Sequence, residues 1–155
     1  RTGHASTLGA ASGAVAGLVA ITPCAGFVGG MAPIFIGLIA GAVCYLALTL
    51  KTRFNFDDSL DVIAVHLVGG ILGALLLGFF SDTKVNSLGF DGVLFGGGSK
   101  LLVNQLIAIG ATFAFSFIVT WVVAKILDAT IGLRVSTEDE LVGLDQSQHA
   151  ESAYQ

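Results

Sequence analysis

Residues 57–80, with the sequence DDSLDVIAVHLVGGILGALLLGFF, determine how this chain must fold. The stretch opens with three carboxylates, Asp57, Asp58 and Asp61, and then contains no further Asp, Glu, Lys or Arg. Its apolar part is about 20 residues long, enough for an α-helix to cross the hydrocarbon core of a bilayer. One histidine, His66, interrupts the apolar residues. Because an ionisable side chain is costly at that depth, His66 is a candidate functional residue.

The composition of the whole chain is that of an integral membrane protein. Of its 155 residues, 54% are hydrophobic and 12% are charged, and the mean hydropathy is +0.87. Soluble domains carry about 25% charged residues. Most of the charge lies in the segments 51–61, 82–84 and 134–151, and no basic patch suits a nucleic acid. The sequence therefore predicts a lipid bilayer as the surroundings and no nucleic-acid partner.

The two cysteines, Cys24 and Cys44, lie in or near apolar segments. We expect them to be small buried hydrophobes, because neither a disulfide nor a metal site is indicated by their spacing. No metal or other cofactor is expected.

The rest of the chain supplies three more apolar segments of membrane-spanning length. We predict spans at residues 8–23, 27–50, 60–80 and 100–127, followed by a polar, acidic tail at 128–155. Gly9, Gly13 and Gly17 form a small-residue stripe on the first span, which predicts close approach of another helix. In the tail, hydroxyls ahead of carboxylates at 136–140 predict a helix start. The expected fold class is an all-α integral membrane protein with four spans and a polar C-terminal tail.

The basic residues predict the orientation of the spans, because cytoplasmic ends carry more lysine and arginine. With four spans, both termini lie on one side. The side that holds the termini carries Arg1, Lys51, Arg53, Lys125 and Arg134. The opposite side carries only Lys84 and Lys100. We therefore expect a multi-pass protein of the plasma or inner membrane with a cytoplasmic C-terminus.

One face of the third span combines an imidazole with small residues. On an α-helix, Val62, His66, Gly69, Gly70 and Gly73 share this face. The glycines leave space for another helix or for a narrow pore. A neutral imidazole offers one donor and one acceptor without a charge, which suits a small solute or a proton relay. The alternative is a core histidine that bonds a backbone carbonyl.

The carboxylates at the mouth of this span, Asp57, Asp58 and Asp61, have two interpretations. They can cap the helix and interact favourably with its dipole. Alternatively, they can form a rim that attracts cations. The sequence alone leaves both open.

Four groups of residues, in order along the chain, resemble the C-terminal part of the ammonium transporter family, the Amt/Rh channels. They are residues 8–23, 25–28, 57–70, and a tail set that includes Gly132, Arg134, Gly143, Asp145 and Tyr154. The resemblance implies helices eight to eleven of the eleven-helix ammonium transporter fold, with residues 128–155 as a cytoplasmic regulatory tail. Leu67 and Ala64 stand where the family usually has glycine, and Leu67 could narrow a pore or shift a helix contact.

The resemblance also implies roles for individual residues and partners. His66 would be one of a pair of pore histidines that take the proton from ammonium or conduct it, and Val62 would be an apolar pore-lining residue. The second histidine belongs to the fifth helix of the family, which this chain lacks. The implied substrate is ammonium or ammonia, with methylammonium as an analogue. The implied partners are two further copies in a homotrimer and a PII-type signal protein at the cytoplasmic face.

Ammonium transport is therefore the leading hypothesis, and the chain is not expected to be an enzyme. The alternative is a membrane ammonium sensor that signals through its tail without significant flux. An intramembrane enzyme with His66 as base would need a nucleophile or a metal cluster beside it, which the sequence does not suggest. Since the chain begins with Arg1 and not with methionine, we expect a piece of a longer protein. Because the resemblance implies that half of the pore wall is absent, we expect the isolated chain to be inactive.

Overall fold

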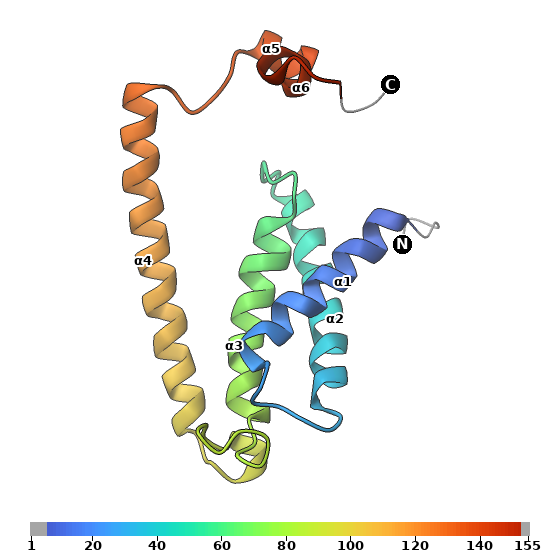
Figure 1. The fold of residues 1–155 in the computed structure, drawn as a ribbon, viewed down its shortest axis with the longest axis vertical. Coiled ribbons are helices and arrows are strands. Elements are labelled where there is room, and N and C mark those ends of the chain that lie inside the picture. The colour runs from blue at the N-terminus through green and yellow to red at the C-terminus, as the bar shows by residue number, and fades with distance from the viewer. Residues whose placement is uncertain (1–5, 153–155) are drawn as a thin grey trace. The chain divides into compact units, whose positions relative to one another are not determined.

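The computed structural model describes residues 6–152, and these residues form helices and connecting segments with no β-strand (Figure 1). The helices are α1 (Thr7–Ile21), η1 (Thr22–Cys24), α2 (Ala32–Arg53), η2 (Val62–Leu67), α3 (Val68–Phe80), η3 (Val93–Phe95), α4 (Lys100–Thr130), α5 (Thr137–Val142) and α6 (Leu144–His149). Within residues 6–152, four stretches are long and apolar enough to cross a membrane: Thr7–Cys24, Ala32–Lys51, Val62–Phe80 and Lys100–Thr130. The predicted all-α class with four spans is confirmed.

The chain divides into two compact units, residues 1–111 and residues 112–155. The core of the first unit lies where α1, α2 and the third span meet, and its buried residues are mostly small. They are Ala16, Ala20 and Cys24 from the first span, Ala32, Ile36, Ala40 and Cys44 from α2, and Ala64, Val65, Gly69, Gly73 and Leu76 from the third span. Small side chains let helix backbones approach closely, which is how membrane helices associate without a hydrophobic driving force.

The closest backbone approach in this core joins α1 to α3. A Cβ atom added to Gly73 would lie 2.2 Å from the carbonyl oxygen of Ala20. The Cys24 thiol donates a hydrogen bond to the Gly73 carbonyl at 3.3 Å. One turn earlier, a Cβ on Gly69 would lie 3.3 Å from Val19 and 3.4 Å from the sulfur of Cys44. Only glycine fits at position 73.

The predicted glycine stripe of the first span is not the face of α1 that packs against the neighbouring described helices. An added Cβ at Gly13 or Gly17 would meet no atom of the described chain within 4 Å. The packed face instead carries Ala16 and Ala20, which have the same four-residue spacing. Both stripes are small enough for close packing, so the sequence pattern does not decide between them.

The start of the second helix was predicted too early, at residue 27. The segment before α2 turns sharply, with positive φ angles of 81° at Gly26 and 59° at Gly30. These left-handed conformations suit glycine and end helical geometry, so α2 begins only at Ala32. Pro33 follows at once, where its missing N–H does no harm.

The loop between α3 and α4 is held by hydrogen bonds at its base. Ser81 is buried, and its hydroxyl donates to the Phe90 carbonyl at 2.6 Å. The Ser81 carbonyl accepts the Gly92 N–H at 2.8 Å, and the Asp82 N–H donates to Phe27 at 2.9 Å. These bonds fix the loop between α3 and α4 against the turn between α1 and α2.

In the second unit, α5 and α6 form a short polar helical pair. Ser136 caps α5, because its hydroxyl accepts the Asp139 N–H at 3.1 Å, and this confirms the predicted helix start. Gly143, with φ at 103°, separates the two helices. The Ser147 hydroxyl donates to the Gly143 carbonyl at 3.0 Å.

We expect Gly73→Ala to destabilise the fold of this chain in detergent micelles. The new methyl group would collide with the backbone of Ala20, and overpacking of this kind typically costs about 1–3 kcal/mol. Gly70→Ala is the matched control, since a Cβ there would meet no described atom within 4 Å. The thermal unfolding midpoint of the two variants checks this, and an unchanged midpoint for Gly73→Ala would contradict the packing described above.

Candidate functional site

The third span begins with a wide helical turn that the sequence did not predict. Residues Val62–Leu67 form a π-helix, and the α-helix continues from Val68. The preceding residue, Asp61, has a left-handed backbone with φ at 58°. A π-turn holds one more residue than an α-turn, and such turns occur often at functional sites. The turn contains both predicted pore residues, Val62 and His66.

The wide turn separates the residues that were expected to share one face. Gly69 and Gly73 are buried against the neighbouring helices. Val62 and His66 are exposed on the described chain, with 48% of Val62 accessible. Gly70, one turn after His66, also faces open space. His66 therefore does not share a face with Gly69 and Gly73, because the π-turn and the packing on α1 place the imidazole on the open side.

The imidazole of His66 has no hydrogen-bond partner among residues 6–152. The interpretation as a core histidine bonded to a backbone carbonyl is therefore not realised within this part of the chain. The ring lies on an open, apolar face with Val62, about one helical turn inside the third span. It is placed to meet whatever occupies the space beside that face.

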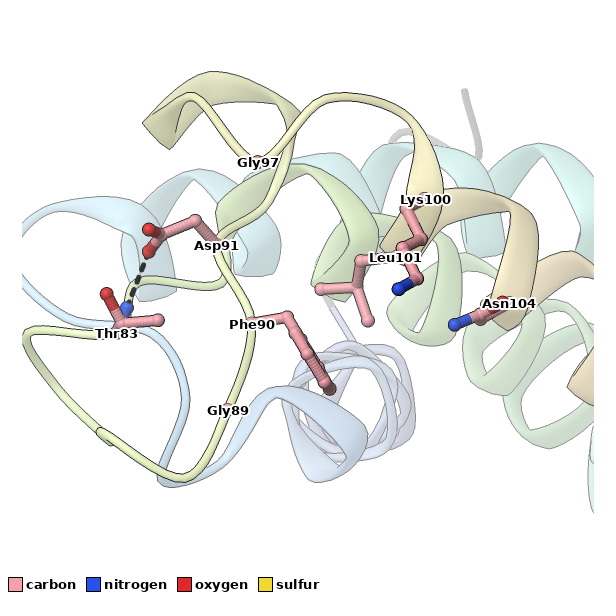
Figure 2. A pocket seen from close by; sticks show the side chains of 8 residues that line it. All are labelled: Thr83, Gly89, Phe90, Asp91, Gly97, Lys100, Leu101 and Asn104. Carbon is pink, nitrogen blue, oxygen red and sulfur yellow. Dashed lines mark hydrogen bonds between the residues drawn. The ribbon is translucent and has the colours of Figure 1, made fainter.

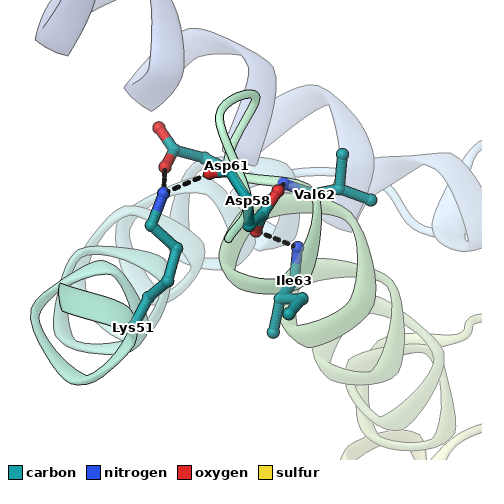
Figure 3. Close-up of polar contacts among 5 residues, drawn as sticks. All are labelled: Lys51, Asp58, Asp61, Val62 and Ile63. Atoms are coloured by element: carbon teal, nitrogen blue, oxygen red, sulfur yellow. Dashed lines mark hydrogen bonds and ion pairs between the residues drawn. The ribbon is translucent and has the colours of Figure 1, made fainter. Parts of the chain in front are cut away.

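Asp58 and Asp61 make polar contacts at the start of the π-turn. The two carboxylate oxygens of Asp58 accept the N–H groups of Val62 and Ile63, each at 2.9 Å (Figure 3). Lys51, in the last turn of α2, donates to the Asp58 carbonyl at 2.5 Å and forms an ion pair with Asp61. Orphan N–H groups at a helix start need such acceptors.

The electrostatics of Asp58 follow from these contacts. The Ile63 N–H lowers the pKa of the Asp58 carboxyl most, and the Val62 N–H and the charges of Lys51 and His66 lower it further, against an opposing effect of burial. The carboxyl therefore stays ionised at neutral pH. These contacts favour the capping interpretation for Asp58 and an ion-pairing role for Asp61, while Asp57 is exposed.

A hollow of about 250 Å³ lies at the other end of the third span (Figure 2). It is lined by Thr83, Gly89, Phe90, Asp91, Gly97, Lys100, Leu101 and Asn104. The ammonium group of Lys100 lies 6.0 Å from the centre of the Phe90 ring, and Asp91 accepts the Thr83 N–H at 2.7 Å. None of the predicted site residues lines this hollow.

The predicted tail residues stabilise turns and short helices. Gly132, with φ at 79°, ends α4, and its N–H donates to the Leu127 carbonyl at 3.0 Å. Arg134 pairs with Glu140 at 2.9 Å on the surface. Asp145 lies in the first turn of α6, after Gly143. Tyr154 lies outside the described residues.

Apolar helices of spanning length, together with an imidazole on an open face of one of them, define a multi-pass helical membrane protein. The sequence matches the Ammonium Transporter Family over residues 1–154. The chain therefore belongs to the ammonium transporter family.

The relatives of this chain are named ammonium transporters. The chain is 51% identical over 152 residues to "Ammonium transporter Amt1" of Archaeoglobus fulgidus, covering 98% of this chain and 38% of that protein. It is 51% identical over 149 residues to the ammonium transporter of Bacillus subtilis, covering 96% and 37%. The fold resembles the crystal structure of Saccharomyces cerevisiae Mep2, with a TM-score of 0.78 and 36% identity over 87% of this chain and 31% of that one. The chain thus spans only about a third of the length of these relatives.

Sequence reasoning missed two features of the site. One is the ion pair of Lys51 with Asp61, although a lysine that ends one span next to the acidic start of the following span is a recognisable signal for such a pair. The π-turn has no such local signal, because its residues also suit an α-helix.

We expect Asp58→Ala to expose the start of the third span to exchange with solvent. The substitution removes the acceptors of two N–H groups, so amide hydrogen exchange at Val62 and Ile63 should become roughly tenfold faster. Ser59→Ala, at an exposed neighbouring position, is the control. Unchanged exchange in Asp58→Ala would contradict the capping role.

The same cap has a defined pH dependence. The pKa of Asp58 in the folded chain is lowered from its ordinary value of 3.8. The contribution of its carboxylate to the stability of the turn is therefore complete above pH 3.8 and is lost as the pH falls through the lower folded pKa. The ratio of exchange rates between Asp58→Ala and the parent should be constant above about pH 5 and approach one only in stronger acid. A ratio that already falls near neutral pH would contradict this assignment.

Proposed function

We propose that this chain forms part of an ammonium or ammonia transport pore, with His66 and Val62 as lining residues. Family membership supports the transport class, and the relatives at 51% identity are named ammonium transporters. The structural observation that carries the proposal is an imidazole on an open face of an apolar span, beside the apolar Val62 side chain.

The proposed chemistry follows from the cost of charge in hydrocarbon. A permanent cation at the bilayer centre costs about 3 kcal/mol on insertion scales. Ammonium can avoid this cost by giving up a proton and crossing as neutral ammonia. A neutral imidazole can accept a proton at one nitrogen while donating from the other. Potassium cannot lose its charge, so the same passage rejects it.

The chain supplies only part of such a pore. It covers 38% of the archaeal relative, and His66 is exposed on the described chain. The remaining wall therefore comes from other helices, and the isolated 155-residue chain would not transport. We place the termini and residues 128–155 in the cytoplasm, where a PII-type protein could meet the tail of a homotrimer.

An ammonium sensor that signals through the tail is the second candidate. It is favoured by the ordered pair α5 and α6, which follows the last span as a short, polar module with its own caps. A sensor would bind ammonium or methylammonium without significant flux. Uptake measurements separate the two functions.

We expect His66→Ala, in the protein that carries this sequence, to lower methylammonium uptake by at least roughly tenfold or to abolish the exclusion of potassium. The reason is that the passage loses its only described proton acceptor in the third span. His149→Ala, at an exposed position in α6, is the matched control and should transport normally. Normal uptake and potassium exclusion in a correctly assembled His66→Ala protein would refute the pore role, and binding without flux in the parent would favour the sensor.

The proposal also predicts the behaviour of the isolated chain. Liposomes containing only residues 1–155 should show no methylammonium uptake above protein-free liposomes, because the chain spans only 38% of the length of its archaeal relative. Saturable uptake by this chain would show that the proposal of a partial pore is incorrect.

A further inference from the structure

We propose that Lys51 is a positioning residue for the pore: it holds the turn that aims Val62 and His66 at the open face. This inference rests on the proposed function of these two residues. It adds a residue from α2, which does not line the face itself. It assigns Lys51 a role in determining the register of the third span.

The contacts of Lys51 bridge two spans. Its side chain leaves the last turn of α2 and reaches two groups at the entry of the next span (Figure 3). One is the backbone carbonyl of Asp58, and the other is the carboxylate of Asp61. Both ends of this ion pair are largely covered, with 16% of the Lys51 and 24% of the Asp61 side chain accessible. A covered pair is screened less by salt than an exposed pair.

The backbone at this entry is one that few residues adopt. Asp61 has φ at 58°, in the left-handed region that favours glycine. Aspartate tolerates this conformation better than most non-glycine residues, and contacts with its surroundings help to hold it there. Here the ion pair fixes the side chain of Asp61, while the Asp58 carboxylate binds the N–H groups of Val62 and Ile63 on the other side of the same turn. Lys51 contacts both aspartates and so joins these two restraints.

The π-turn determines how Val62 and His66 are rotated about the axis of the third span. The helix after it is fixed, because Gly69 and Gly73 are packed against neighbouring helices. A π-turn inserts one residue, and one residue of an α-helix corresponds to roughly 100° of rotation. If the turn relaxed to α-helix, Val62 would rotate by up to that angle around the axis, and His66, nearer to α3, by less. Loss of Lys51 should therefore be visible first at Val62.

The experiment uses the whole protein that carries this sequence, with Val62→Cys as the reporter. We measure the rate at which a water-soluble thiol reagent labels the protein that carries Val62→Cys. The labelling rate of the same protein without Val62→Cys is subtracted as background. The chain's own Cys24 and Cys44 are buried. Methylammonium uptake and potassium exclusion are measured in parallel without the reporter.

Lys51→Met should slow reporter labelling by about fivefold and lower methylammonium uptake. Lys51→Arg keeps the positive charge, so its labelling rate and its uptake should equal those of the parent. Arg53→Met is the matched control, since Arg53 is an exposed base in the same turn of α2, and it should change neither. Asp61→Asn is a second variant that removes the same ion pair from the other side. It should reproduce the effect if Lys51→Met does not assemble.

Parent-like labelling and uptake in an assembled Lys51→Met or Asp61→Asn protein would overturn the role of Lys51. This result is distinct from failure of the proposed function. If His66→Ala transports normally, the pore role fails, yet slower labelling in Lys51→Met would still establish that Lys51 holds the turn. If His66→Ala is inactive and Lys51→Met labels like the parent, only the positioning role fails.

Discussion

The close contact between the backbones of α1 and α3 is the constraint on which the rest of the first unit depends. Gly73 lies against the carbonyl of Ala20 with no room for a side-chain atom. Hydrocarbon surroundings give apolar helices no reason to associate, so packing at this distance has to supply the attraction. The contact fixes the third span in rotation, and that decides which of its residues point inward and which remain open.

The functional face follows from this packing and from the turn that precedes it. With Gly69 and Gly73 committed to neighbouring helices, His66 can face an open space only if the residues before Val68 are rotated away from the packed face. The π-turn supplies the rotation, and the contacts of Asp58 and Asp61 with Lys51 stabilise its start. Asp58 and Asp61 thus serve the geometry of the turn that carries the His66 imidazole.

The sequence predicted the features that are encoded locally. The four spans follow from uninterrupted apolar residues, and the helix at Ser136 follows from its capping chemistry. What it could not predict depends on contacts between distant residues. Glycine and alanine stripes on α1 are equally small, so only the partner helix selects Ala16 and Ala20. The pore role of His66 remains a prediction that rests on the family resemblance.

The length of α4 has a consequence for how this protein responds to its membrane. Its 31 residues measure about 46 Å along the axis, whereas the hydrocarbon of a typical bilayer is about 30 Å thick. The surplus must be absorbed by tilt or by turns that project into the headgroups. A thicker membrane takes up more of this length within its hydrocarbon, so the surplus left to tilt or to projecting turns shrinks as the membrane thickens.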